Sequence, residues 1–387
     1  MSNKPAVTIA SHYISQFGEL WDKSLPDLIK EAMEQVIARA DQAKLAPENI
    51  EAVFIANKAG GSFTGQRHLN ALASSFLSHQ PPAIRVEGAC ASGGLAVMAA
   101  VDALLSGRYE TVLVVGAEKM SDLSASETTE ILASAADMEA EYGSTFPALY
   151  ALLADAHMRE FGTTREQLSA VAVKNHRQAM TNPQAQYHRE FTLDQVSTST
   201  PVADPLRLLD CSPITDGAAA IILTTKKIPH KPIIIGRGHA QDSLDLAGRS
   251  SLTTLAATVK AAQQAYTEAG AKPSELEAAE VHDCFTIAEI LAIEDLGFVE
   301  KGQGGVATLA GDLPVKINLS GGLKACGHPV GATGVKQVAY MAGLIESGQY
   351  QLGLTHNVGG SGATAVVHII AAPDRKPRSS RSPKGTR

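Results

Sequence analysis

An internal duplication constrains the fold more than any other feature, because two related segments of one chain should fold alike. Two pairs of segments share their residue pattern: 46–58 with 272–284, and 90–110 with 331–351. Within them Asn57 stands opposite Asp283, and Cys90 stands opposite Gly331. A duplication on this scale predicts two similar halves packed against each other.

Each half alternates expected strands and helices. In the first half we expect strands at 6–14, 52–55, 83–89 and 111–120, with helices at 25–41 and 89–107. In the second half helices at 253–270 and 331–348 alternate with the extended segments 278–285, 315–322 and 352–360. This alternation indicates a layered α/β fold. The segment 119–204 has no counterpart in the second half, and we interpret it as a functional insertion.

Composition places the chain among folded proteins. Of 387 residues, 44% are hydrophobic and 19% charged, which suits two or three packed domains. The formal net charge is -7, so the body lacks the basic face of a duplex-binding protein. Residues 373–387 form a basic segment that we expect to be disordered, with a polyanion-binding arm as the alternative.

The cysteine content and the N-terminus bear on the compartment. Four cysteines are too few for a disulfide scaffold in a chain of this length, which favours a reducing compartment. The first residues contain no apolar signal-peptide core, and no apolar run reaches membrane-spanning length. We therefore expect a cytoplasmic protein.

Cys90 lies in VEGACASGG, between an expected strand and an expected helix. A helix N-terminus carries a positive partial charge, so we expect it to lower the pKa of the thiol and to hold an oxyanion. The small residues around Cys90 leave room for a bulky substrate. The alternative is a small buried cysteine at a strand-helix junction.

His328, in GLKACGHPVGATG, lies at what we expect to be another strand-to-helix junction. The duplication sets this junction opposite that of Cys90, so two halves related by a pseudo-two-fold axis can bring Cys90 and His328 together. An imidazole that takes a thiol proton is what nucleophilic catalysis by cysteine needs. A structural turn residue before Pro329 is the alternative.

Two further segments carry candidate catalytic groups. VHDCF places His282, Asp283 and Cys284 at the end of an expected strand, where an imidazole or thiol could act as acid or base. HNVGGSG, residues 356–362, offers glycine amides for an oxyanion hole, with a plain hairpin turn as the alternative. A zinc site of His282, Cys284, Cys326 and His328 is disfavoured, because each pair has a single intervening residue.

Taken together, these segments resemble the thiolase superfamily over residues 6–371, and most nearly the thiolases of sterol-carrier-protein type that carry HDCF. GAEKMS, VAVKNH, NPQAQ and CSPITDGAAA add to the resemblance. It implies two duplicated βαβαβαββ halves in a five-layer αβαβα arrangement with an inserted loop domain. The implied ranges are 1–118 with 205–245 for the first half, 119–204 for the loop domain and 246–372 for the second half.

The resemblance also implies roles for individual residues. Cys90 would be acylated, His328 would take its proton, and His282 with His328 would stabilise an enolate. Ordinary thiolases carry a Cys-x-Gly segment where this chain has His356-Asn357-Val358-Gly359, so Cys284 would replace the missing second cysteine. His356 is the fallback for that role. The amides of Cys90 and Gly359 would form an oxyanion hole.

The implied activity is acyl transfer between coenzyme A thioesters, by thiolysis of 3-ketoacyl-CoA or the reverse condensation. No metal or redox cofactor is implied, and coenzyme A is a substrate. Its phosphates would meet a cation among Arg159, Lys174, Arg177 and Arg207. A homodimer or homotetramer is expected, without nucleic-acid or membrane partners. The alternatives are an acyltransferase without carbon-carbon cleavage and a catalytically silent acyl-CoA or lipid binder.

Overall fold

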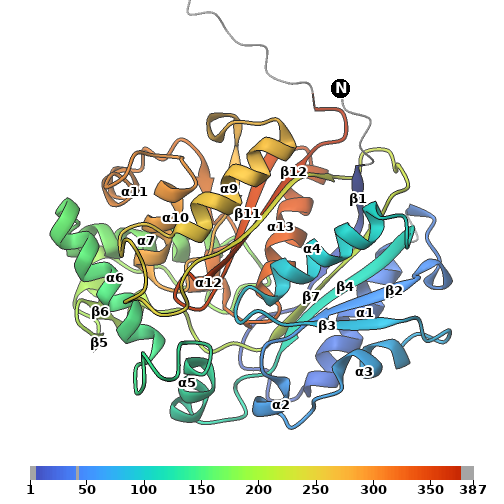
Figure 1. Cartoon of the computed structure of the whole chain (residues 1–387), viewed down its shortest axis with the longest axis horizontal. Helices are drawn as coiled ribbons and strands as arrows, with labels where there is room; N and C mark the ends of the chain where they lie inside the picture. The colour runs from blue at the N-terminus through green and yellow to red at the C-terminus, as the bar shows by residue number, and fades with distance from the viewer. Residues whose placement is uncertain (1–5, 41–42, 376–387) are drawn as a thin grey trace, which may run out of the picture.

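The computed structural model describes residues 6–40 and 43–375, and its strands and helices repeat in two halves (Figure 1). The first half contains β1 (Val7–Ile14), α1 (Leu25–Ala40), β2 (Ala52–Ala56), α2 (Gly60–Phe63), α3 (Leu69–Ser75), β3 (Ala83–Val86), α4 (Ser92–Leu105), β4 (Thr111–Glu118) and β7 (Gly217–Thr224). The second contains β8 (Ile233–Gln241), α9 (Ala256–Ala269), β9 (Ala278–Glu280), α10 (Thr286–Asp295), α11 (Gly304–Ala310), β10 (Lys316–Ile317), α12 (Gly322–Cys326), α13 (Thr333–Glu346), β11 (Leu352–Gly359) and β12 (Thr364–Ala371).

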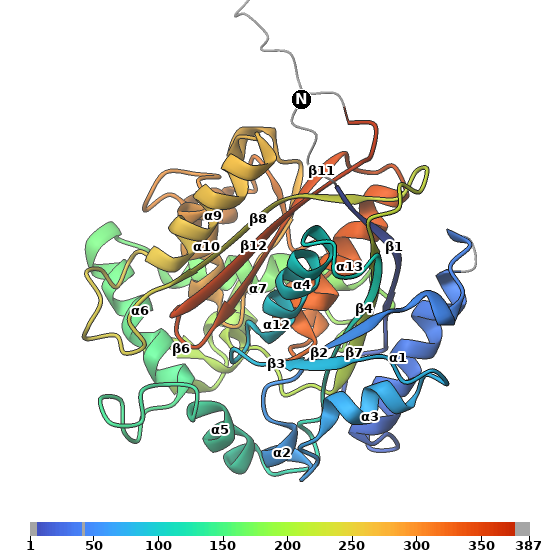
Figure 2. The same ribbon diagram turned by 45° about the vertical axis from the view of Figure 1, so that its right-hand side comes forward.

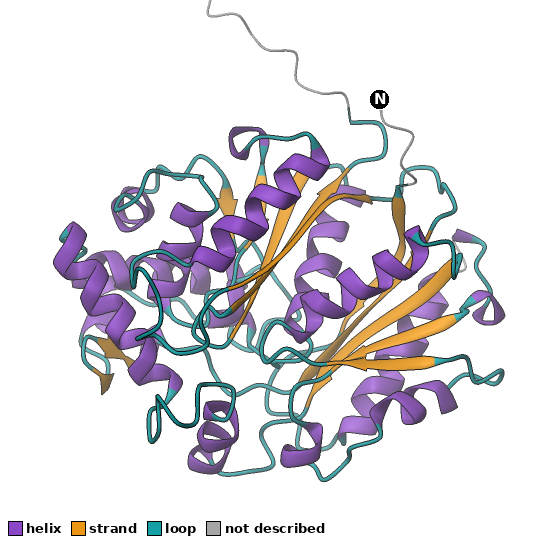
Figure 3. Ribbon diagram, in the orientation of Figure 1, coloured by secondary structure: helices purple, strands orange, loops and turns teal. Residues whose placement is uncertain are grey.

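Strand order confirms the duplication. The first half runs β3-β2-β4-β7-β1 and the second runs β10-β9-β11-β12-β8, so corresponding strands occupy corresponding places. The two sets join where β1 pairs with β8 at only two positions. Figure 3 shows them diverging from this junction. The strand order therefore places β8 with the second half, although the sequence analysis assigned residues 205–245 to the first.

Five layers result, as the resemblance implied. Helices α1 and α3 cover the outer face of the first sheet, α4 and α13 lie between the sheets, and α9 and α10 cover the second sheet (Figures 1 and 2). The strands read as almost continuous apolar runs because both faces of each sheet are covered. The central layer is the tightest: a Cβ added at Gly93 of α4 would lie 2.6 Å from the backbone nitrogen of Gly334 on α13.

The insertion between β4 and β7 forms helices on one side of the two sheets. It contains α5 (Ala125–Ala133), α6 (Phe146–Phe161), α7 (Arg165–Ala179), α8 (Leu193–Ser197), β5 (Pro201–Ala203) and β6 (Leu206–Arg207). That residues 119–204 act as a separate loop domain stays a prediction.

The remaining expectations concern the ends of the chain and membranes. Most of the basic segment 373–387 lies outside the described residues. None of the helices that the structure describes is long and apolar enough to cross a bilayer.

Candidate active site

Cys90, His282 and His328 meet at the junction of the two halves. The Cys90 sulfur and one ring nitrogen of each histidine all lie within 4.8 Å of one another. The two imidazole rings meet edge to face with centroids 5.0 Å apart. The convergence of Cys90 with His328 that the duplication predicted is therefore present in the structure.

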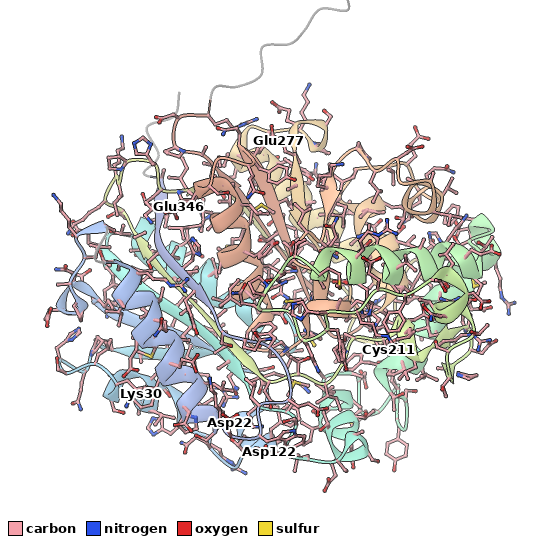
Figure 4. The ribbon with its side chains drawn as sticks, turned by 180° about the vertical axis from the view of Figure 1, so that it is seen from behind. Asp22, Lys30, Asp122, Cys211, Glu277 and Glu346 are labelled. Carbon is pink, nitrogen blue, oxygen red and sulfur yellow. The ribbon has the colours of Figure 1, made fainter. Side chains whose placement is uncertain are left out.

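A cavity of about 140 Å³ opens onto these three residues. Its remaining wall is mainly apolar and comes from the insertion between β4 and β7, the turns before α10 and α13, and the turn between β11 and β12. The lining residues used below are Tyr150, Cys211, Cys284 and Gly360. Cys211, labelled in Figure 4, lies beside the helices of the insertion. Both α/β halves and the insertion therefore contribute to one small site.

Cys90 precedes its helix instead of lying in the first turn, since α4 begins at Ser92. Ala89 adopts φ +52°, which tightens the turn that presents the thiol. Burial raises the pKa of Cys90 to about 11, although the Lys58 ammonium acts to lower it. The expected lowering of the pKa by the helix N-terminus was wrong, because the desolvation of the thiolate outweighs it. The Cys90 thiol is therefore neutral at rest, and to act as a nucleophile it would need a base.

His328 is the candidate for that base, and its ring is held in one orientation. It follows the short helix α12, so the strand expected before it is wrong beyond the two residues of β10. The Thr333 hydroxyl donates to the Pro329 carbonyl at 3.0 Å and lies 2.7 Å from His328 Nδ1, so it accepts the Nδ1 proton. Burial, with help from the Lys336 ammonium, lowers the pKa of His328 to about 3. The ring is therefore neutral, and its Nε2 lone pair has no partner among the described residues.

Cys284 lies in the cavity wall, in the turn between β9 and α10. Burial raises the pKa of its thiol above the usual range, so it is protonated and can donate a proton. The neighbouring Tyr150 ring stacks on Phe285 with centroids 4.7 Å apart, and its hydroxyl donates to Gly360 O at 3.2 Å. These contacts fix the wall that carries Cys284.

His356 does not belong to the site. Successive residues of a strand point to opposite faces. His356 points toward α9, where its Nε2 lies 2.9 Å from Thr258 Oγ1, whereas Asn357 points toward Cys90. The fallback role of His356 as the second acid/base group is therefore wrong, because its side chain points away from Cys90.

The glycine expected in the oxyanion hole lies beside the Cys90 turn. A Cβ on Gly359 would come within 2.6 Å of Gly88 O, so only glycine allows this approach. Gly360, the next residue, lines the cavity and has φ +63°. That the backbone amide of Gly359 forms the oxyanion hole stays a prediction. Gly360 is the neighbouring residue of the same turn.

Sequence reasoning passed over three residues that organise the site: Asn357, Thr333 and Glu118. Glu118 is buried at the end of β4 and accepts from Lys58 N at 2.8 Å and from Gly331 N at 3.1 Å. It thereby ties the first half to the loop after His328. The alternation of facing residues in β11 was the available signal for Asn357, which stands next to His356 in the motif.

The four candidate cations for coenzyme A lie away from the cavity wall. Arg159 pairs with Asp155, Lys174 with Glu289 and Arg177 with Glu190, and Arg207 donates to Ser199 O. The zinc set considered from sequence is not assembled either: the Cys326 thiol instead meets Asn182 Nδ2 at 3.5 Å.

Comparison with known proteins agrees with this geometry. Family models for the thiolase N-terminal domain and the thiolase C-terminal domain-like family match residues 7–227 and 238–372. Acetyl-CoA acetyltransferase of Methanothermobacter thermautotrophicus is 45% identical, with 92% of this chain and 97% of that protein covered. Sterol carrier protein 2 of Bos taurus is 31% identical, with 89% and 68% covered.

Solved structures share the fold at lower identity. An Ltp2-ChsH2(DUF35) aldolase has a TM-score of 0.81 at 24% identity, with 96% of this chain and 99% of that chain covered. Human mitochondrial 3-ketoacyl-CoA thiolase in complex with CoA has a TM-score of 0.77 at 18% identity, with 95% and 98% covered.

Proposed function

Because this chain belongs to the thiolase family and is a thiolase, we propose that it transfers an acetyl group between coenzyme A thioesters through an acyl-Cys90 intermediate. The observation that carries the proposal is the meeting of a thiol, a neutral imidazole base and a second imidazole within 4.8 Å. The relatives named acetyl-CoA acetyltransferase support acetyl as the transferred group.

In the thiolysis direction, the Cys90 sulfur attacks the 3-keto carbon while its proton passes to His328 Nε2. The bond between carbons 2 and 3 then breaks, and its electron pair forms an enolate on the departing thioester. Hydrogen-bond donors at the enolate oxygen lower this barrier, and His282 is placed to supply one. Cys284 gives its proton to carbon 2, which releases acetyl-CoA. The thiol of a second coenzyme A then gives its proton to the Cys284 thiolate and attacks the acyl carbon. The bond from that carbon to the Cys90 sulfur breaks, and Cys90 recovers its proton from His328.

Several finer expectations accompany this proposal. Thiolysis of 3-ketoacyl-CoA would place the enzyme in lipid metabolism, such as fatty acid β-oxidation, in the cytoplasm. We also propose a homo-oligomer, because β3 is the last strand of its sheet and leaves one edge unpaired, with the Ile84 side chain 52% exposed.

The test is turnover of a panel of 3-ketoacyl-CoA esters with coenzyme A, from acetoacetyl-CoA to long chains. We expect Cys90→Ala to abolish acetyl-CoA formation, and Cys284→Ala to lower kcat by about 10²–10⁴-fold. Cys326→Ala is the matched control, because that thiol is equally buried but lies outside the cavity wall. No turnover of any ester by the wild-type protein would reject the proposal in favour of a silent acyl-CoA binder.

A further inference from the structure

Asn357 makes three hydrogen bonds at the centre of the site. Its Nδ2 donates to Cys90 O at 2.9 Å and lies 3.2 Å from His282 Nδ1, and its Oδ1 accepts from Gly94 N at 3.0 Å. The side chain is 2% exposed. It therefore touches the backbone of the nucleophile, the helix that follows and one of the two active-site imidazoles.

These partners permit one orientation of the amide. A carbonyl such as Cys90 O needs a donor, and a backbone N–H such as Gly94 N needs an acceptor. Turning the amide over would set oxygen against oxygen and N–H against N–H. The Nδ2 group must therefore lie on the side of Cys90 O and His282.

The orientation of the amide in turn decides the proton on His282. An N–H of Asn357 faces Nδ1, so Nδ1 must be the nitrogen with the lone pair. Burial, followed by the nearby His328 and His356, lowers the pKa of His282 well below its usual value, so the ring is neutral. A neutral imidazole carries a single N–H, and here it is on Nε2.

We propose that Asn357 is a positioning residue that holds His282 as a hydrogen-bond donor toward the cavity. His282 and His328 then face Cys90 with opposite properties: His328 Nε2 accepts a proton and His282 Nε2–H stabilises a developing oxyanion. The inference rests on the proposed function for its catalytic consequence, although the proton position can be measured without turnover.

The same arrangement explains why Cys90, His282 and His328 can serve acid-base chemistry although their side-chain atoms are as close together as metal ligands. Cys90, His282 and His328 are the described residues whose donor atoms are close enough to hold an ion. A metal-bound imidazole must offer a lone pair at the metal and commonly donates its other N–H to a neighbour. Asn357 presents a donor where such a neighbour would need to accept. His282 is thereby kept from acting as a ligand through Nε2.

The duplication shows that Asn357 is particular to the second half. The strands β4 and β11 correspond residue by residue, and Gly116 takes the equivalent place in β4. Gly116 packs against the backbone of Gly331, where a Cβ would lie 2.6 Å from the carbonyl oxygen. An amide side chain is therefore present in the half that carries both histidines, and it enters the space beside Gly94 and Gly334.

The experiment compares wild type, Asn357→Leu and the control Gln337→Leu. Gln337 is also a buried amide and donates to His356 O at 3.0 Å, but it does not contact His282. Nitrogen-15 NMR of histidine-labelled protein, with His282 assigned from its missing signal in His282→Asn, reports which ring nitrogen carries the proton. Steady-state kinetics with acetoacetyl-CoA give kcat and KM separately.

We expect the Nε2–H form in wild type and Gln337→Leu, and a mixture of the two forms in Asn357→Leu. We also expect kcat of Asn357→Leu to fall by about 10²–10³-fold with KM little changed, as for loss of an oxyanion donor. A wild-type Nδ1–H form, or a wild-type kcat in Asn357→Leu, would overturn the inference. A wild-type protein with the Nε2–H form but no turnover would sustain the assignment of the proton while rejecting the proposed function.

Discussion

Burial governs the titration of the active-site residues. The partly buried Cys90 thiol and the buried Cys284 thiol are both protonated, and the buried imidazoles of His282 and His328 are both neutral, so these four side chains carry no charge before substrate enters. Catalysis then depends on the direction of each hydrogen bond. Because Thr333 accepts from His328 and Asn357 donates to His282, two chemically identical side chains take opposite tasks.

Thr333→Val tests this reading at a single hydroxyl. The substitution preserves the shape but removes the acceptor of the His328 Nδ1 proton, so the base loses its fixed tautomer. We expect kcat/KM to fall about 10- to 100-fold, the usual cost of losing a partner that orients a functional histidine. Thr258→Val, which removes the partner of the buried His356 on the face of β11 toward α9, serves as control and should retain activity. Equal losses in both variants would contradict the assignment.

Asp283 gives a pH prediction. Burial, together with the neighbouring Glu289 carboxylate, raises the pKa of Asp283 to about 7 from an ordinary value of 3.8. The folded state therefore binds this proton more tightly than the unfolded state. Its contribution to stability is fully present below about pH 4 and is lost as the pH rises through about 7.

Glu289→Gln removes the like charge and should bring the pKa of Asp283 down. Other buried groups titrate as well, so the informative quantity is the difference between variant and wild type in the urea midpoint at about pH 5 and about pH 8. We expect a smaller fall with pH in the variant. An unchanged or larger fall would show that Glu289 does not act on Asp283.

At the scale of elements, the central helices α4 and α13 carry the geometry of the site. Each begins just after one of the two loops that hold Cys90 and His328, and they cross where Gly93 meets Gly334. A Cβ at Gly94 would also come within 3.1 Å of Asn357 Oδ1. The distance from nucleophile to base is therefore set by a glycine-to-glycine contact between two helices.

Gly93→Ala should force these helices apart. We expect a loss of about 1–3 kcal/mol in the free energy of unfolding, as for an overpacked core, together with a drop in turnover because Cys90 moves from His328. Gly343→Ala on α13 is the control: its Cβ would first meet the His12 ring at 3.2 Å, and the change should stay within about 1 kcal/mol. Urea denaturation measures the free energy of unfolding of both variants. An unchanged free energy of unfolding in Gly93→Ala would contradict the packing argument.

The elements were largely predictable from the sequence, whereas the directions of side chains were not. Repeated residue patterns located β2 with β9 and α4 with α13, because duplicated segments keep their periodicity. The pKa of Cys90 failed as a prediction, because desolvation depends on neighbours distant in sequence. His356 was chosen over Asn357 because a sequence motif does not state which face of a strand meets the site. Alternation along β11 puts His356 and Asn357 on opposite faces, but which face meets the site became clear only once α9 and α4 were placed on opposite sides of β11.

At the scale of the whole molecule, the two halves and the insertion enclose the site together, yet the sheet of the first half remains open at β3. An unpaired edge strand with an exposed apolar side chain is a pairing site for another chain. This is the structural basis on which we expect an oligomer.

Ile84→Lys should therefore lower the molar mass measured by light scattering after gel filtration, because a charged side chain opposes strand pairing at the edge. Val259→Lys, at a 39% exposed position on α9, introduces the same charge on a helix that covers the second sheet and should leave the mass unchanged. A monomeric wild-type protein, or equal effects of both variants, would contradict an assembly through β3.

The central claim is that Cys90 is the residue that carries the acyl group. The cavity wall holds three thiols, those of Cys90, Cys211 and Cys284, so acylation can be assigned among neighbours in one experiment. The protein is incubated with acetyl-CoA, quenched in acid and examined by intact-mass and peptide mass spectrometry, before and after addition of coenzyme A. The account predicts one acetyl group, on the Cys90 peptide, that coenzyme A removes. An acetyl group on Cys211 or Cys284, or an unmodified protein, would contradict it.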